Sequence, residues 1–234
     1  MNKILKLYGL NKEEVQEKLN TVLNSLPKNT KISIKEKYLD ISLDISSDAE
    51  DNINTVIKQI FDKCKNYIYA DGYVTLYEKL AEVLDVRNKK LCIMEQATGG
   101  VLATNLLAID GTDKHIVSSL VLPTTDGWIR AYDIDPRMLT ENKGISSKLV
   151  FSIASAMRRT YLADYYIVAV SSDAVGLEVY NIEKGIDDNP YSLVAIGDST
   201  GVDIFKISLS GDKRDRNNQT AKAICYKLIT EMKK

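Results

Sequence analysis

One short segment of the sequence places a carboxylate, a hydroxyl and two glycines directly after an apolar run. Residues 91–94 are continuously apolar, which is typical of a parallel strand buried on both faces, and they are followed by Glu95-Gln96-Ala97-Thr98-Gly99-Gly100. In open α/β sheets, ligands bind where the carboxyl end of a strand turns into a helix. Two glycines let a ligand approach the backbone, and a helix N-terminus offers N–H groups to an anion. Glycines equally permit close helix–strand packing, so the segment alone leaves both interpretations open.

The amino-acid composition excludes several kinds of catalytic and metal site. The 234 residues include one histidine, His115, so a site of several histidines around a metal is excluded, and a Ser-His-Asp triad would depend on that residue alone. His115 precedes a predicted strand, where we expect a surface residue rather than a catalyst. Twelve glycines leave little material for phosphate-binding loops. No metal or cofactor is predicted. The cysteines are widely spaced, which favours small core residues in a reducing compartment; they are Cys64, Cys92 and Cys225.

Charge and hydropathy are those of an ordinary soluble globular protein, with 44% hydrophobic and 27% charged residues. The formal net charge is −1, so nothing in the overall balance favours nucleic acid or anionic lipid as a partner. The start of the chain lacks an apolar signal segment, and no run of about 18 apolar residues offers a membrane span. We therefore expect a cytoplasmic protein without a membrane partner.

Other side chains with catalytic potential have simpler interpretations. Thr98 or Ser171 could act as a nucleophile, but neither has an evident lysine or histidine base nearby. Lys89 and Lys90 stand at the amino end of a predicted strand, away from the predicted site, and are expected to be solvated. Three pairs of carboxylates are expected to be solvated turn residues; they are Asp110 with Asp113, Asp133 with Asp135, and Asp187 with Asp188.

Two regions with different patterns must position these residues. Residues 3–70 predict the order strand, helix, strand, strand, helix, strand, which is the βαββαβ arrangement of ferredoxin-like domains. Asn11 is the expected N-cap of the first helix, whose apolar stripe runs from Val15 to Leu23. The segment Lys35-Glu36-Lys37 is the predicted connection between the two middle strands.

From about residue 73, strands alternate with helices. Short apolar runs predict buried strands at 91–94, 116–122 and 167–170, and residues 193–196 and 202–207 predict an antiparallel pair turned at 198–201. Ser146 is the expected cap of one helix, and a final helix runs from Ala221 to Met232. The predicted fold class is α/β. A small βαββαβ domain over residues 1–72 precedes a three-layer α/β/α domain over residues 73–234.

Several motifs together resemble a known family. Residues 95–100 resemble the Glu-Ser-x-Thr-Gly-Gly motif of the C-terminal domain of the CinA (competence-damage-inducible protein) family. Further segments follow in the order and spacing of that family: Pro136-Arg137-Met138-Leu139, Lys143-Gly144-Ile145-Ser146, Ala163-Asp164 and Ser210-Gly211-Asp212-Lys213. The βαββαβ unit, which closes with Tyr67-Ile68-Tyr69, is similar to the KH-type domain that precedes this domain in long CinA proteins. The molybdopterin-binding-like N-terminal domain of those proteins is expected to be absent.

The resemblance implies an amidase that converts nicotinamide mononucleotide to nicotinic acid mononucleotide and ammonia without a metal. In the family, the motif serine is taken as the nucleophile, activated by a tyrosine and a lysine. The serine position is Gln96 here, the tyrosine position is Pro123 and the lysine position is Trp128. A glutamine side chain can form hydrogen bonds but cannot attack a carboxamide, and neither proline nor tryptophan supplies a base. Trp128 is expected either to pack in the core or to offer a surface on which a base stacks.

A second family loop has also diverged. A glycine-rich segment of the family corresponds to residues 171–176, where only Gly176 remains and Asp173 adds a negative charge near the position of a phosphate. The closing arginine of the family corresponds to Asn217, with Arg214 and Arg216 nearby as substitutes. The remaining candidates for contact with a ligand are the polar and glycine residues of the three loops: Glu95, Thr98, Gly99, Gly100, Thr124, Thr125, Ser171 and Ser172.

These observations favour a CinA-like protein that kept the fold and lost the amidase chemistry, with a remaining role in binding a nucleotide-like molecule or in assembly. The family resemblance implies a homo-oligomer. The alternative is a hydrolase that acts on nicotinamide mononucleotide or a related amide with altered catalytic residues. Nucleic-acid binding is not expected, because RNA recognition by KH domains depends on a Gly-x-x-Gly loop and residues 3–70 contain only Gly9.

Overall fold

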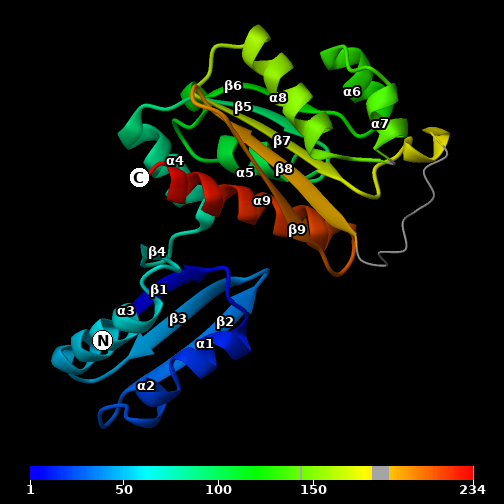
Figure 1. The fold of residues 1–234 in the computed structure, drawn as a ribbon. Coiled ribbons are helices and arrows are strands. Elements are labelled where there is room, and N and C mark those ends of the chain that lie inside the picture. Colours follow the sequence, from blue (N-terminus) through cyan, green and yellow to red (C-terminus); the bar gives the residue numbers. More distant parts are fainter. Residues whose placement is uncertain (143, 181–189, 234) are drawn as a thin grey trace. The chain divides into compact units, whose positions relative to one another are not determined.

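Alternating apolar and polar residues near the start of the chain fold into a four-stranded antiparallel sheet with the strand order β2-β3-β1-β4 (Figure 1). The computed structural model describes residues 1–142, 144–180 and 190–233. These divide into two units, one of residues 80–225 and the other of residues 1–79 with the end of the chain from Tyr226. The elements of the smaller sheet and its helices are β1 (Asn2–Tyr8), α1 (Lys12–Lys18), α2 (Asn20–Asn24), β2 (Lys31–Lys37), β3 (Asp40–Ser46), α3 (Glu50–Cys64) and β4 (Ile68–Asp71).

The predicted βαββαβ order is confirmed in this unit, with the first helix divided into α1 and α2 at Leu19. Asn11 caps α1 as expected: its side chain accepts a hydrogen bond from the backbone nitrogen of Glu14, whose carboxylate accepts one from the nitrogen of Asn11. One apolar core joins the strands to the helices, with residues such as Leu7, Leu43 and Ile60 fully buried.

The predicted position of one hairpin is wrong. Lys35-Glu36-Lys37 lies within β2, and the chain turns at Tyr38 and Leu39 instead, between the paired residues Lys37 and Asp40. Both turn residues have φ near 60°, as a two-residue type I′ turn requires. Glycine or asparagine usually marks such a turn in a sequence, so the pair Tyr38-Leu39 does not predict one.

The larger unit contains a five-stranded sheet with the order β6-β5-β7-β8-β9. Strands β6, β5 and β7 are parallel, whereas β8 and β9 continue the sheet in antiparallel fashion. The predicted strands and the turn at 198–201 are confirmed, and Ser146 caps α8 by accepting a hydrogen bond from the nitrogen of Leu149. The elements from residue 76 are α4 (Leu76–Arg87), β5 (Leu91–Glu95), α5 (Val101–Leu107), η1 (Asp113–His115), β6 (Ile116–Val121), α6 (Thr125–Tyr132), α7 (Arg137–Glu141), α8 (Ser147–Thr160), β7 (Tyr165–Ser171), η2 (Leu177–Tyr180), β8 (Tyr191–Gly197), β9 (Val202–Ser208) and α9 (Lys213–Glu231).

Helices cover both faces of this sheet. Figure 1 shows α6, α7 and α8 over one face and α5 and α9 over the other. The core beneath α6 and α8 contains Trp128 and Ile153, both fully buried. Helices α6 and α7 have no counterpart in the sequence prediction. No helix among the described residues is long and apolar enough to cross a membrane.

His115 lies at the amino end of the parallel strands and is buried, contrary to the prediction of a surface residue; only 3% of it is exposed. Its Nδ1 lies 2.8 Å from the carbonyl oxygen of Lys89, and its Nε2 lies 3.3 Å from a carboxylate oxygen of Asp85. Hydrogen bonds from Lys114 and His115 lower the pKa of Asp85. Lys89 pairs with Asp164 at the start of β7, 3.0 Å between the charged groups. The histidine therefore helps to hold the strand starts together, through partners that are distant in the sequence.

Candidate functional site

The carboxyl ends of the parallel strands bring together the loops that the sequence singled out. The backbone nitrogens of Gln96 and Ala97, after β5, both donate to the carbonyl oxygen of Ala169 in β7. Thr124, after β6, forms a parallel bridge with Val175, in the loop after β7. The two loops therefore meet at one edge of the sheet, where open α/β folds bind ligands.

Glu95 is fully buried, and its carboxyl group holds the start of α5. One oxygen accepts hydrogen bonds from the hydroxyl of Thr98 at 2.5 Å and from the nitrogen of Leu102 at 3.0 Å. The other accepts from the nitrogen of Ala103 at 3.0 Å and from the hydroxyl of Ser119 at 3.2 Å. Two N–H groups that a helix start would offer to an anion are thus bound by a carboxylate of the chain itself. Thr98 is fully buried as well.

The glycine pair permits close approach of the chain to itself. Gly99 and Gly100 have φ values of 57° and 89°, the left-handed region that favours glycine. A side chain at Gly99 would stand 2.6 Å from the amide of Asn217 in α9, and one at Gly100 would stand 3.2 Å from Val121. With its amide oriented to satisfy its neighbours, Asn217 donates to the carbonyl oxygen of Ala97 at 3.0 Å. The sequence left two interpretations of this glycine pair open, ligand binding and close packing of the helix against the strand. These contacts support close packing.

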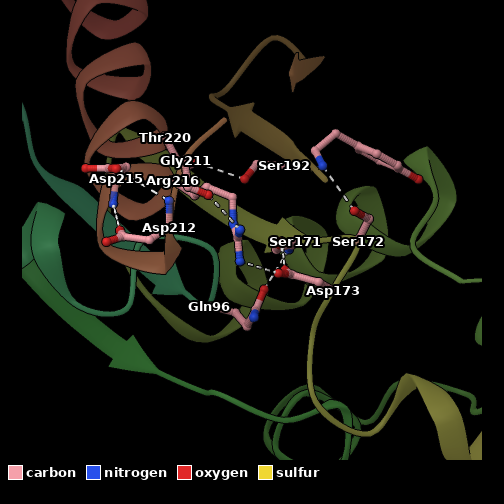
Figure 2. A network of polar contacts seen from close by, with 11 residues as sticks. Gln96, Ser171, Ser172, Asp173, Ser192, Gly211, Asp212, Asp215, Arg216 and Thr220 are labelled. Atoms are coloured by element: carbon pink, nitrogen blue, oxygen red, sulfur yellow. Dashed lines mark hydrogen bonds and ion pairs between the residues drawn. The ribbon is translucent and has the colours of Figure 1, made fainter. Parts of the chain in front are cut away.

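A chain of polar contacts connects the turn after β5 to α9 (Figure 2). The side-chain oxygen of Gln96 accepts a hydrogen bond from the nitrogen of Ser171 at 2.6 Å. The hydroxyl of Ser171 donates to Asp173, whose other carboxylate oxygen lies 2.8 Å from the guanidinium of Arg216. Arg216 also donates to the carbonyl oxygen of Gly211 at 3.0 Å. Ser171 is buried, whereas the side chains of Asp173 and Arg216 are 37% and 21% exposed.

Three further hydroxyl groups near this network hold parts of the sheet in place. Ser172 exchanges two hydrogen bonds with Tyr191: its nitrogen donates to the carbonyl oxygen of Tyr191, and its hydroxyl accepts from the nitrogen of the same residue. Ser192 and Thr220, both fully buried, form a hydroxyl pair 2.8 Å apart. These contacts fix the start of β8 and attach α9 to the sheet.

The loop after β6 leads into α6. Pro123 is exposed, and Thr124 caps α6 by accepting a hydrogen bond from the nitrogen of Gly127 at 3.3 Å. Thr125 is buried, and its nitrogen donates to the carbonyl oxygen of Val175. Trp128 is fully buried, and its indole nitrogen donates to the carbonyl oxygen of Leu122 at 2.8 Å. Of the two roles left open for Trp128, core packing is the one observed.

Two of the three predicted pairs of carboxylates lie in or beside turns, as predicted. Asp110, Asp113 and Asp133 are exposed, and Asp135 is paired with Arg137 at 2.6 Å. Asp187 and Asp188 lie outside the described residues. Within the described ranges, no group of three or more His, Cys, Asp or Glu side chains could hold a metal ion.

Two contacts at this edge were not predicted from the sequence. Ser119 supports Glu95 from the middle of β6, and Arg216 pairs with Asp173 across 43 residues. A lone serine in a strand gives no sequence signal. The arginine and the aspartate were each noticed in the sequence, but only the fold makes them partners.

Comparison with known proteins identifies the family that this arrangement represents. The family model of the CinA C-terminal domain matches residues 74–232. This chain belongs to the CinA family. A putative competence-damage inducible protein of Halothermothrix orenii is 21% identical over 100% of this chain and 56% of its own length. A CinA-like protein of Petrotoga mobilis is 24% identical over 89% of this chain and 49% of its own length. The chain therefore spans about half the length of these curated CinA relatives.

Solved CinA structures share the fold. The crystal structure of a competence or damage-inducible protein from Enterobacter asburiae aligns with a TM-score of 0.57 and 22% identity, covering 67% of this chain and 96% of that one. A CinA superfamily protein from Klebsiella pneumoniae aligns with the same TM-score and 18% identity, covering 67% of this chain and 95% of that one. The α/β fold expected from the sequence is thus confirmed as a CinA fold.

Proposed function

We propose that this CinA-family chain does not hydrolyse nicotinamide mononucleotide, and that its remaining role is to bind a nucleotide-like molecule or to assemble with further copies of itself. The contact between Gln96 and Ser171 carries the proposal. Gln96 stands where the family resemblance places the serine nucleophile. Its side-chain oxygen is held by the nitrogen of Ser171 at 2.6 Å, so the residue has a structural partner in place of a catalytic one.

The other two catalytic positions support the same conclusion. Trp128, at the lysine position, is fully buried, and its indole N–H is bound to Leu122. Pro123, at the tyrosine position, has no side-chain donor or base. A serine introduced at position 96 alone would therefore lack the partner that must take its proton.

Ammonia release tests this proposal. The purified chain is incubated with nicotinamide mononucleotide, and ammonia is measured beside a CinA protein that retains the motif serine. We expect no release above the level without protein. Robust turnover would overturn the proposal.

One observation favours the alternative, a hydrolase with altered machinery. The hydroxyl of Ser171 donates to Asp173, so a carboxylate is placed to accept the proton of a nucleophile. Under this alternative, a panel of amides would reveal a hydrolysis that Ser171→Ala and Asp173→Asn both abolish and that Thr98→Val leaves intact, because Thr98 is fully buried. The absence of any hydrolysis across the panel would count against it.

The proposal also includes the division of the chain into domains and its oligomeric state. We treat residues 1–72 as a KH-type domain and residues 73–234 as the CinA C-terminal-like domain, in a cytoplasmic homo-oligomer. Light scattering of the whole chain tests the oligomeric state, and a monomer at micromolar concentration would remove assembly from the proposal.

A further inference from the structure

Arg216 provides a cation at the edge of the sheet where ligands of this fold class bind, and the chain itself supplies the counter-ion. The guanidinium lies 2.8 Å from one carboxylate oxygen of Asp173 and also donates to the carbonyl oxygen of Gly211. The other oxygen of Asp173 accepts from the hydroxyl of Ser171. Both oxygens of this carboxylate thus accept hydrogen bonds, and two N–H groups of Arg216 donate to acceptors within the protein (Figure 2).

Backbone donors in the surrounding segments are bound by carboxylates in the same way. Glu95 accepts from two N–H groups at the start of α5. Glu178 accepts from the nitrogen of Gly176 at 3.0 Å, in the loop that contains Asp173. At the start of α9, Asp212 accepts from the nitrogen of Asp215 at 2.8 Å. Helix starts and glycine loops are the elements that hold phosphate in other α/β proteins, and here carboxylates of the chain itself occupy these donors.

Phosphate is therefore disfavoured for two reasons. It would have to displace Asp173 from Arg216, and it would then stand beside an uncompensated carboxylate of like charge. A ligand without negative charge meets neither obstacle. Because Asp173 and Arg216 are both partly exposed, the pair can be reached by small ions, and its effect on binding can be measured.

We propose that Asp173 is a specificity-determining residue, which holds Arg216 so that this edge of the sheet disfavours phosphate, and that the nucleotide-like ligand of the proposed function is one without a phosphate group, a nucleoside. The proposal deepens the proposed function, since it rests on a site that binds rather than hydrolyses, and it names the class of ligand. Nicotinamide riboside and nicotinamide mononucleotide form a suitable probe pair, because they differ only in the phosphate.

The test measures binding by calorimetry in a phosphate-free buffer of low ionic strength, with inorganic phosphate, the mononucleotide and the riboside as probes. We expect Asp173→Asn to bind phosphate and the mononucleotide at least tenfold more tightly than the unchanged chain does, with no such gain for the riboside. The double variant Asp173→Asn with Arg216→Gln should lose the gain. Asp173→Ala repeats the measurement without a side-chain amide, and thermal unfolding verifies that each variant is folded.

Asp126→Asn is the matched control. Asp126 is also an exposed carboxylate paired with an arginine, Arg130, at 2.8 Å, so this change alters the net charge equally but leaves Arg216 paired. Three results would each overturn the inference: an unchanged chain that binds phosphate as tightly as Asp173→Asn, no gain in either variant of Asp173, or an equal gain in Asp126→Asn. Turnover of the mononucleotide by the unchanged chain would overturn the proposed function too. Tight phosphate binding by the unchanged chain, without turnover, would overturn this inference alone.

Discussion

The side-chain oxygen of Gln96 lies 2.6 Å from the backbone nitrogen of Ser171. This hydrogen bond joins the turn after β5 to the last residue of β7, 75 residues away in the sequence. Both segments belong to the edge where the fold places ligands. Gln96, which stands where the family resemblance places a serine, thus helps to hold the strand ends of this edge together.

Removing the side chain of Gln96 should destabilise the fold. In Gln96→Ala, the partly buried N–H of Ser171 loses its acceptor, at a cost of about 1 to 3 kcal/mol. Urea unfolding measures this loss, and Gln96→Glu, which keeps an acceptor oxygen, is the control.

Gln96→Ser should release no ammonia from nicotinamide mononucleotide, because Pro123 and Trp128 are unchanged; a serine variant that does so would contradict our account of the site.

Glu95 should matter more for stability than the exposed carboxylates nearby. Glu95→Ala leaves two backbone N–H groups and two hydroxyl groups without their acceptor in a buried place, which we expect to cost about 2 to 5 kcal/mol. Glu178→Ala, which removes one exposed contact to Gly176, should cost less than about 1 kcal/mol. Equal losses in the two variants would show that Glu95 does not hold α5.

The hydroxyl of Tyr132 is an isolated polar group in the core. It is buried and has no hydrogen-bond partner among the residues that the structure describes. Burial also raises the pKa of this phenol, so it stays protonated. Tyr132→Phe should leave stability unchanged or raise it by about 1 kcal/mol, because an unpaired buried hydroxyl carries a desolvation cost. Trp128→Phe, which removes a bonded indole from the same core, should be clearly destabilising; a large loss for Tyr132→Phe would reveal a partner for the hydroxyl.

The three cysteines should be unreactive in the folded chain. All are buried, and burial raises the pKa of Cys64, of Cys225 and of Cys92, the last to about 11. Since the thiolate is the reactive form, a pKa near 11 leaves about one Cys92 in a thousand reactive at pH 8, and raising the pH increases that fraction. Labelling with a thiol reagent should therefore be slow at pH 8, faster at higher pH, and complete in denaturant. Rapid labelling of the native chain would show that the core opens readily.

Local sequence signals predicted most of the fold. Alternation along residues 40–46 and the continuous apolar run at 91–94 follow from burial on one face or on two, and both segments are strands in the structure. Asn11 and Ser146 were readable as helix caps because a cap acts within three residues. The turn at Tyr38 and Leu39 was missed because its backbone has positive φ without the residues that usually signal it.

By itself, the sequence determined most of the order of elements, the CinA resemblance, and the presence of Gln96, Pro123 and Trp128 where that resemblance leads one to expect serine, tyrosine and lysine, because each of these is a property of residue type and spacing. Only the tertiary structure decided that His115 is buried against Asp85, that Glu95 holds α5, and that Asp173 neutralises Arg216. These contacts join segments brought together by the sheet or a turn, and their energies depend on burial and partner geometry, which the spacing of residues along a chain does not record.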